Sequence, residues 1–207
     1  MEWYNFPMPL EKRIFDITAA CLGMIATAPI WLLIIIINFL FHGTPVIFHQ
    51  VRPGYKGKPF TLYKFRTMDD ARTSTGELLP DSNRLTGFGR LLRTLSLDEL
   101  PELINILRGD MSFVGPRPLL MEYLTLYSPA QARRHDAVPG LTGWAQIHGR
   151  NAADWPTRLA MDVWYVDHWS FWLDMRIILT TLWKVIRREN ISQLGQATVE
   201  YFKGNKD

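Results

Sequence analysis

Hydrophobic residues concentrate first in one long N-terminal segment. From Ile17 to Phe41 no residue carries a formal charge. At a rise of about 1.5 Å per helical residue, this run is long enough to cross a bilayer. Pro29 follows Ala28 near its middle, and a proline inside a helix removes a hydrogen bond and predicts a kink. Each arm alone is shorter than the roughly 20 residues that a spanning helix needs.

Basic residues flank this segment on both sides: Lys12, Arg13, His49, Arg52, Lys56 and Lys58. The positive-inside rule therefore favours both ends on the cytoplasmic side. A re-entrant helix that bends at Ala28 and Pro29 and returns to the same face satisfies both observations, with Thr27 as a candidate partner for the backbone freed at the bend. The alternative is a single-pass anchor with a proline kink. In addition, Lys12 and Asp16 have the i,i+4 spacing of an ion pair.

Shorter patterns follow the apolar segment. Val46–Gln50 and Phe60–Phe65 are rich in β-branched and aromatic residues, and the turn-forming VRPGYKGKP between them predicts a β-hairpin. The polar segment 69–84 predicts an exposed loop. Apolar periodicity predicts four helices, which are Phe88–Leu95, Glu99–Leu107, Thr157–Trp169 and Ser170–Arg188.

The remaining segments complete an α+β, mainly helical fold. SFVGPRP predicts a strand that enters a rigid turn, Met121–Ala137 a helix, loop and helix, and Pro139–Gly149 a loop. The last long helix has Ser170 as its N-cap, a broad apolar surface and a basic end. This pattern suits an amphipathic helix in a membrane interface, and a core helix of a soluble domain is the alternative. We expect residues 1–42 to form the membrane anchor and residues 43–207 a cytoplasmic domain with interfacial helices.

Composition narrows the class of protein. The chain has 207 residues, of which 47% are hydrophobic and 21% charged, so it can pack a core and is not intrinsically disordered. The net charge of +3 is compatible with a phosphate-bearing partner or an anionic membrane surface. The single cysteine, Cys21, excludes a disulfide within the chain. The length of the apolar run and the lack of a small-x-small site after it argue against a cleaved signal peptide.

Two adjacent acids, Asp98 and Glu99, begin a predicted helix. A structural interpretation exists, because Ser96-x-x-Glu99 matches a capping box. Pro101 weakens it, since a helix that begins at Leu97 or Asp98 accommodates this proline better. In the functional interpretation, the two carboxylates hold Mg²⁺, which prefers oxygen ligands and bridges to substrate phosphates.

Two arginines surround this pair in the sequence. Arg93 precedes it by one to two helical turns, and Arg117 stands between two prolines that stiffen its backbone. Guanidinium groups bind phosphate with two hydrogen bonds. Acids, a metal ion and rigid arginines form a phosphoryl-transfer arrangement. From spacing alone, a structural ion network is an equal alternative.

Three long motifs connect these residues with a known family. SLDELPELINILRGDMSFVGPRPLL at 96–120, KFRTM at 64–68 and PGLTGWAQIHGRN at 139–151 resemble, nearly end to end, signature blocks of the monotopic phosphoglycosyl transferases of bacteria. The apolar segment with its central proline is similar to the family's re-entrant helix, although the family commonly has Ser where this chain has Ala28. The resemblance covers the whole chain and matches the small form of the family. The segment 195–204 is similar to the tail of its diacetylbacillosaminyl phosphate transferases.

The resemblance implies a fold, a reaction and a set of roles. Asp98 attacks the β-phosphate of a UDP-sugar, UMP leaves, and polyprenyl (undecaprenyl) phosphate then takes the sugar phosphate from Asp98. Glu99, with Asp98, holds Mg²⁺. The expected phosphate-binding residues are Arg93, Arg117, Lys64 and Lys12. The expected nucleotide- or sugar-binding residues are Arg150 and Asp162.

The resemblance also implies partners and a location. The partners are a UDP-sugar, the polyprenyl phosphate lipid, membrane phospholipids and downstream glycosyltransferases of glycoconjugate biosynthesis, and nucleic acid is not among them. The expected location is the cytoplasmic face of the bacterial inner membrane. Two rivals stay open: a membrane-anchored Mg²⁺-dependent hydrolase of UDP-sugars or lipid phosphates, and a non-catalytic scaffold that uses the acids as a helix cap.

Overall fold

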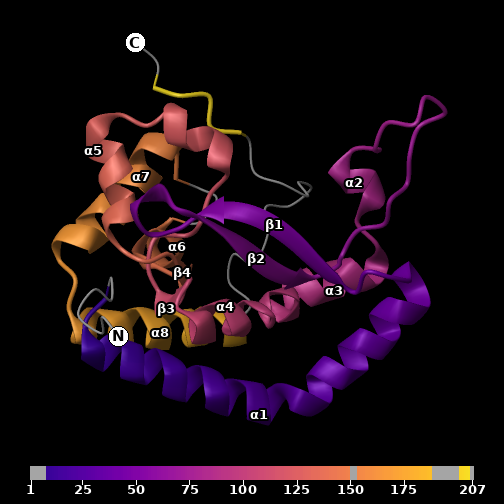
Figure 1. The fold of residues 1–207 in the computed structure, drawn as a ribbon, viewed down its shortest axis with the longest axis horizontal. Coiled ribbons are helices and arrows are strands. Elements are labelled where there is room, and N and C mark those ends of the chain that lie inside the picture. Colours follow the sequence, from indigo (N-terminus) through magenta and orange to yellow (C-terminus); the bar gives the residue numbers. More distant parts are fainter. Residues whose placement is uncertain (1–7, 150–152, 188–200, 206–207) are drawn as a thin grey trace.

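A computed structural model describes residues 8–149, 153–187 and 201–205 (Figure 1). These described residues are mainly helical and include two small two-stranded sheets, which confirms the α+β prediction. The long helix α1 runs along one edge of the molecule, and the other elements lie together on one side of this helix (Figure 1). Arg150 and most of the tail used in the family resemblance lie outside the described residues.

Helix α1, Leu10–His42, has Pro29 inside it and bends partway along its length (Figure 1). The proline deprives the carbonyl of Ile25 of its donor, because helical N–H groups bond to the carbonyl four residues back. The hydroxyl of Thr27 donates instead to the carbonyl of Gly23, at 2.7 Å. The prediction that Thr27 serves the freed carbonyl is therefore wrong, although such back-bonding itself favours a bend.

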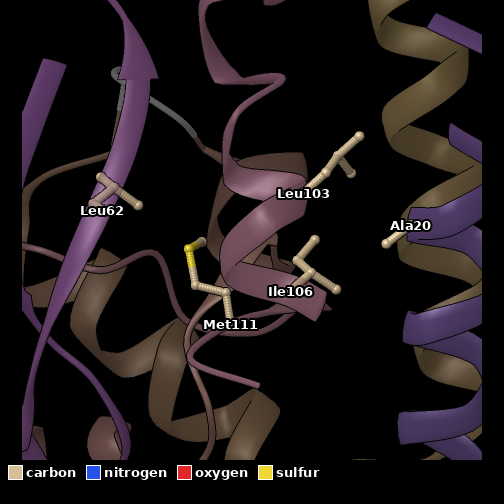
Figure 2. Close-up of a cluster of buried hydrophobic side chains, with 5 residues drawn as sticks. All are labelled: Ala20, Leu62, Leu103, Ile106 and Met111. Carbon is tan, nitrogen blue, oxygen red and sulfur yellow. The ribbon is translucent and has the colours of Figure 1, made fainter. Parts of the chain in front are cut away.

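Both arms of α1 pack against the same body of the protein. Ala20, from the first arm, joins the cluster of Leu62, Leu103, Ile106 and Met111, which come from β2, from α4 and from the residues after it (Figure 2). Ile34, from the second arm, packs with Phe65 and Leu92. The helix is long and apolar enough to cross a membrane, by length and composition. Its bend nevertheless keeps both of its arms against one domain.

The predicted hairpin is confirmed. β1, Ile47–Pro53, pairs antiparallel with β2, Pro59–Phe65, and the short 3-10 turn η1, Tyr55–Gly57, joins them. The first strand continues through Pro53, three residues beyond its predicted end, because cross-strand pairing includes Pro53 with Pro59. The polar segment after β2 is largely irregular and ends in the short helix α2, Asp81–Arg84.

The next elements carry the acidic pair. Helix α3, Gly87–Thr94, is followed by the 3-10 turn η2, Leu97–Glu99, and by helix α4, Glu102–Arg108. The helix predicted over Glu99–Leu107 is therefore α4, which begins three residues later than predicted, at Glu102, and Glu99 belongs to the preceding turn. Ser96 has a left-handed backbone conformation with φ 55°, and its side chain caps no helix. The capping-box interpretation is therefore wrong.

A parallel strand pair lies behind this region. β3, Ser112–Val114, pairs with β4, Gly140–Thr142, which is followed by helix α6, Trp144–His148. The prediction of a loop over Pro139–Gly149 is therefore wrong, because this segment contains β4 and α6. The strand β4 forms only by pairing with β3, which lies far away in the sequence. Gly140 is required at this pairing, since a Cβ there would lie 2.0 Å from the amide nitrogen of Gly115.

The C-terminal half contains the turns and helices η3 (Met121–Thr125), α5 (Pro129–Ala132), η4 (Arg133–Asp136), α7 (Trp155–Asp167) and α8 (Phe171–Ile186). Helix α8 contacts both strands of the sheet formed by β3 and β4. The N-cap prediction is confirmed, because the Ser170 hydroxyl accepts from the amide of Leu173 at 3.2 Å. α8 also leaves large apolar side chains exposed, and Trp172 is 79% exposed.

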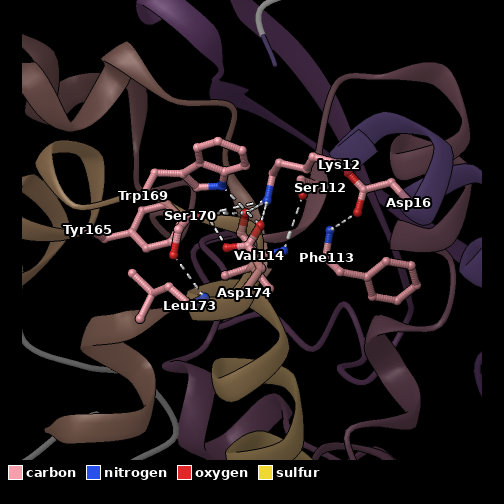
Figure 3. Close-up of polar contacts among 10 residues, drawn as sticks. All are labelled: Lys12, Asp16, Ser112, Phe113, Val114, Tyr165, Trp169, Ser170, Leu173 and Asp174. Carbon is pink, nitrogen blue, oxygen red and sulfur yellow. Dashed lines mark hydrogen bonds and ion pairs between the residues drawn. The ribbon is translucent and has the colours of Figure 1, made fainter. Parts of the chain in front are cut away.

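A buried polar network fastens the start of α1 to the domain (Figure 3). We call Lys12, Asp174, Tyr165 and Trp169 the anchor cluster. The Lys12 ammonium pairs with Asp174 and donates to the carbonyl of Val114 at 2.9 Å and to the Tyr165 hydroxyl at 3.4 Å. The predicted pair of Lys12 with Asp16 is therefore wrong: the partner of Lys12 comes from α8.

Candidate active site

The acids Asp98 and Glu99 lie on the short turn η2, between α3 and α4 and against strand β2. Pro101 prevents a regular first turn of helix here, because it has no N–H to donate. Hence the acids stand on a tight turn before α4, with the side chain of Glu99 19% exposed and Asp98 8% exposed. Both are almost enclosed, so their charges depend on nearby partners.

Two cations hold Glu99. The Lys64 ammonium, from β2, lies 2.6 Å from its Oε1, and the Arg117 guanidinium lies 2.5 Å from the same oxygen. Burial opposes ionisation of Glu99, but the charges of Arg117 and Lys64 outweigh it and hold the pKa of Glu99 well below its ordinary value. The charge of Glu99 in turn raises the pKa of Arg117. These three residues are therefore fixed as ions at neutral pH.

A third acid, Glu102, belongs to the same group, and sequence reasoning missed it. It is 2% exposed, and its Oε1 lies 3.1 Å from the Lys64 ammonium. Burial and the charge of Glu99 raise its pKa to about 7, although Lys64 lowers it. The signal was available, because Glu102 follows Glu99 at i,i+3 spacing and puts a charge beside the apolar Leu103 and Ile106. We call Asp98, Glu99, Glu102, Lys64 and Arg117 the carboxylate cluster.

Asp98 differs from the other two acids. No group among the described residues donates a hydrogen bond to its carboxylate, and no cation there forms an ion pair with it. Burial and the charge of Glu99 raise the pKa of Asp98, whereas the charges of Lys64, Arg93 and Arg117 lower it. Asp98 is therefore the acid of the cluster that is left available, in a surrounding rich in positive charge.

Arg93 lies at the edge of this group. Its Nε donates to the Thr67 hydroxyl at 3.2 Å, and its charge acts on Asp98. The structure thus brings together five of the residues predicted for phosphate chemistry, which are Asp98, Glu99, Lys64, Arg93 and Arg117. Guanidinium and ammonium groups around an available carboxylate form a binding site suited to a phosphate-bearing ligand.

A buried brace fixes the backbone at Arg117. The guanidinium of Arg134 donates to the carbonyl of Arg117 at 2.7 Å and pairs with Asp162 at 2.7 Å. Both Arg134 and Asp162 are buried. Asp162, predicted to contact nucleotide or sugar, therefore lies behind the site, where it orients Arg117 through Arg134.

The other predicted site residues lie apart from the carboxylate cluster. Lys12 is 4% exposed and is committed to the anchor cluster, so the structure does not bring it to Asp98. Ala28 and Pro29 lie in α1, as the bend prediction requires. Arg150 lies outside the described residues.

The carboxylate oxygens of Asp98 and Glu99 fit a Mg²⁺ ion that is bound by both protein and substrate. Among the described residues no group of three or more His, Cys, Asp or Glu side chains gathers as a complete metal site. Mg²⁺, however, is commonly held by one or two carboxylates together with substrate phosphates and waters. The carboxylate of Asp98 and the Oε2 atom of Glu99 accept no hydrogen bond among the described residues, and both are hard oxygen ligands.

Comparisons with known proteins identify the family of this chain. The model of the bacterial sugar transferase family matches residues 8–188. The chain is 58% identical over 196 residues to the uncharacterized sugar transferase EpsL of Bacillus subtilis, covering 95% of this chain and 97% of that protein. It is 39% identical over 196 residues to a UDP-glucose:undecaprenyl-phosphate glucose-1-phosphate transferase of Caulobacter vibrioides, covering 87% and 72%.

A longer relative carries the same region. The chain is 37% identical over 195 residues to the undecaprenyl-phosphate galactose phosphotransferase of Salmonella typhimurium, which covers 86% of this chain and 41% of that protein. The family match includes the anchor helix, the acidic turn and the two arginines. The chain therefore belongs to the bacterial sugar transferase family.

Proposed function

We propose that the protein transfers a sugar 1-phosphate from a UDP-sugar to a polyprenyl phosphate, such as undecaprenyl phosphate, and releases UMP. The observation that carries this proposal is the state of Asp98: a buried carboxylate without a hydrogen bond among the described residues, next to an acid that is held by two cations. A carboxylate in this state can act as a nucleophile towards phosphorus. The activities named for the relatives support the same donor and acceptor classes.

In the first step, a carboxylate oxygen of Asp98 attacks the β-phosphorus of the UDP-sugar. The bond from this phosphorus to the bridging oxygen breaks, UMP leaves with that oxygen, and the sugar phosphate is esterified to Asp98. Arg93, Arg117 and Lys64 provide the positive charge around the reacting phosphates. Such fixed charges stabilise the transition state because they need no rearrangement during the reaction.

In the second step, an oxygen of the polyprenyl phosphate attacks the same phosphorus. The bond between phosphorus and the Asp98 oxygen breaks, which regenerates the carboxylate and leaves the sugar on a polyprenyl diphosphate. One difficult transfer is thus divided into two easier ones. The product is the substrate class of downstream glycosyltransferases, which would extend it for a polysaccharide or a glycoprotein.

Asp98 and Glu99 would hold Mg²⁺ in this proposal. When bound, the ion supplies Lewis-acid neutralisation of the charge on the diphosphate. Lys64 and Arg117 keep Glu99 ionised, and Glu99 therefore offers its Oε2 atom at every pH near neutrality. Asp98 needs to be ionised to act. Burial and the charge of Glu99 raise its pKa, and the charges of Lys64, Arg93 and Arg117 oppose this rise.

The test is product identity. The full chain, in detergent or nanodiscs, is supplied with Mg²⁺, polyprenyl phosphate and a panel of UDP-sugars that includes UDP-diacetylbacillosamine, UDP-glucose and UDP-galactose. We expect UMP and a lipid diphosphosugar to form in equal amounts. Repeated turnover should require the lipid acceptor. A hydrolase would release nucleotide continuously without the lipid, and that result would remove the proposal.

Asp98→Asn tests the nucleophile. We expect turnover to fall on the order of 10⁴-fold or more, because the covalent step is lost, with unchanged thermal unfolding. Asp167→Asn, at an exposed acid of α7, is the matched control and should keep wild-type turnover. Mass spectrometry of protein quenched with the donor alone should place the sugar phosphate on the peptide that contains Asp98. Attachment to another residue would contradict the mechanism.

The proposed location is the cytoplasmic face of the bacterial inner membrane, with α1 re-entrant. Two observations support it: both arms of α1 pack on one body of the protein, and α1 and α8 leave many large apolar side chains exposed. This arrangement keeps the active site at the headgroup plane, where the phosphate of the lipid substrate lies. Thiol reporters at Met1 and Gly57 should both react from the cytoplasmic side; reaction from opposite sides would make α1 a true span.

A further inference from the structure

Glu102 has no part in the mechanism above, although it is buried in the middle of the charged groups. It is the first residue of α4, and its carboxylate faces Lys64 of β2. The other charged groups that act on it are Glu99 from η2, Arg117 from the turn after β3, and Arg52 from β1. A buried carboxylate costs free energy unless it is paired, so its presence here calls for a reason.

Lys64 is divided between two acceptors. Its ammonium lies 2.6 Å from Oε1 of Glu99 and 3.1 Å from Oε1 of Glu102. A third carboxylate, Asp98, is close enough for its charge to act on Lys64, yet the two form no ion pair. The ammonium therefore donates a hydrogen bond to Glu99 and forms an ion pair with Glu102, and neither contact involves Asp98.

A lysine on a single acceptor is poorly fixed. Its four-carbon stem rotates freely, and its ammonium is a point charge without the rigid fork of a guanidinium. If Glu99 were the only acceptor, the ammonium could turn to Asp98. An ion pair there would occupy the carboxylate that has to attack phosphorus. A second acceptor removes this freedom by fixing the ammonium at two points.

We propose that Glu102 is a positioning residue that holds the Lys64 ammonium against Glu99 and thereby keeps Asp98 free to react. This inference rests on the proposed function, because it assigns Glu102 a purpose only if Asp98 is the nucleophile. In this proposal, the position of the acceptor oxygen of residue 102 controls where the Lys64 ammonium lies. The charge of residue 102 matters less than this position.

Two conservative variants separate position from charge. Glu102→Gln keeps an acceptor oxygen at the same distance from the backbone and removes the charge. Glu102→Asp keeps the charge and withdraws the acceptor by one methylene. Glu122→Gln and Glu122→Asp, at an exposed acid of η3, are the matched controls.

The measurement is the single-turnover rate constant for UMP release from the UDP-sugar, without lipid acceptor, in the full chain with Mg²⁺. A rate constant of this kind does not depend on the fraction of folded protein. We expect Glu102→Asp to be slower by about 10- to 100-fold, as for other residues that orient a reacting group from behind. KM for the donor should stay near the wild-type value, because donor-binding groups are unchanged. Glu102→Gln and both Glu122 variants should react like the wild type.

The reverse order of rates would overturn the inference. If Glu102→Asp reacts like the wild type while Glu102→Gln is slow, the charge is what matters. If both react like the wild type, or both are equally slow, residue 102 does not act by placing Lys64. Failure of the proposed function has a different signature, since the wild type itself would then give no UMP or no lipid product.

Discussion

The anchor cluster and the carboxylate cluster both bury charges, but they distribute hydrogen bonds differently. In the anchor cluster, the Lys12 ammonium has three acceptors. Both oxygens of Asp174 are also occupied, because Oδ1 accepts from the Tyr165 hydroxyl at 2.7 Å and Oδ2 accepts from Lys12 and from the Trp169 indole at 3.1 Å. Each charged group of the Lys12–Asp174 pair therefore has its hydrogen-bonding atoms engaged (Figure 3).

In the carboxylate cluster, three acids compete for the cations. Glu99 takes Lys64 and Arg117, Glu102 shares Lys64, and Asp98 receives no hydrogen bond among the described residues. A fully satisfied buried network rigidifies a protein, whereas a partly satisfied one shifts pKa values and marks a reactive site. The comparison teaches that the distribution of partners, more than burial itself, separates a structural charge from a chemical one.

The largest expected effect comes from disrupting the anchor cluster. Lys12→Met replaces the ammonium by an apolar side chain of similar length and leaves the Asp174 carboxylate buried without a cation. We expect the free energy of unfolding to fall by about 3–5 kcal/mol, because an uncompensated buried charge remains. The measurement is chemical denaturation in detergent micelles. The single-turnover rate constant of the folded protein should not change, since Lys12 does not reach Asp98.

Two further variants control this experiment. Lys56→Met removes the exposed pair with Asp136, whose side chains are 54% and 38% exposed, and should not change stability measurably. Combining Lys12→Met with Asp174→Leu should recover most of the loss, because the orphaned charge is removed with its partner. If Lys12→Met alone is as stable as the wild type, the anchor cluster is not what fastens α1.

Local patterns predicted much of this molecule. The hairpin, helix α3 and the Ser170 cap follow from neighbouring residues, since turn chemistry, periodicity and capping act within a few positions. The acidic pair and Arg117 were also visible, because they lie within one continuous motif. Each of these features is encoded by residues that are close in the sequence.

Several of the errors share one physical cause, which is pairing over long sequence separations. The i,i+4 spacing pairs Lys12 with Asp16, whereas its partner, Asp174, comes from the last long helix. The segment 139–149 lacked a strand pattern, because β4 is three residues long and is formed only by pairing with β3. Likewise, nothing near Asp162 in the sequence indicates that it pairs with Arg134, which lies 28 residues earlier.

Glu102 shows a different limit. Its i,i+3 spacing from Glu99 was visible, but whether a charge on a helix faces solvent or Lys64 depends on the placement of β2. Asn105 fixes that placement through two hydrogen bonds with the backbone of β2. Its side-chain nitrogen donates to the carbonyl of Thr61 at 2.7 Å, and its side-chain oxygen accepts from the amide of Tyr63 at 3.1 Å. Tertiary contacts of this kind decide the role of a residue that the local pattern leaves open.

A smaller expected effect is a pH dependence of stability that comes from Glu102. Burial and the charge of Glu99 raise the pKa of Glu102 from 4.5 to about 7 in the folded protein. Between these two values the folded state therefore binds more protons than the unfolded state. Stability falls with pH wherever the folded state binds more protons. The contribution of Glu102 is thus fully present below pH 4.5 and is lost as the pH rises through 7.

Glu102→Gln isolates this contribution, because the amide does not titrate. We expect the free energy of unfolding of the wild type, relative to Glu102→Gln, to fall by at most about 3 kcal/mol between pH 4.5 and 7.5. Both proteins are measured by chemical denaturation without added divalent cations, and Glu122→Gln is the control that should run parallel to the wild type. A difference that stays constant over this range would mean that Glu102 is already ionised in the folded protein. In that case all three acids of the carboxylate cluster would be ionised at the same time. Lys64 and Arg117 would then have to stabilise these charges more strongly than their shared contacts indicate.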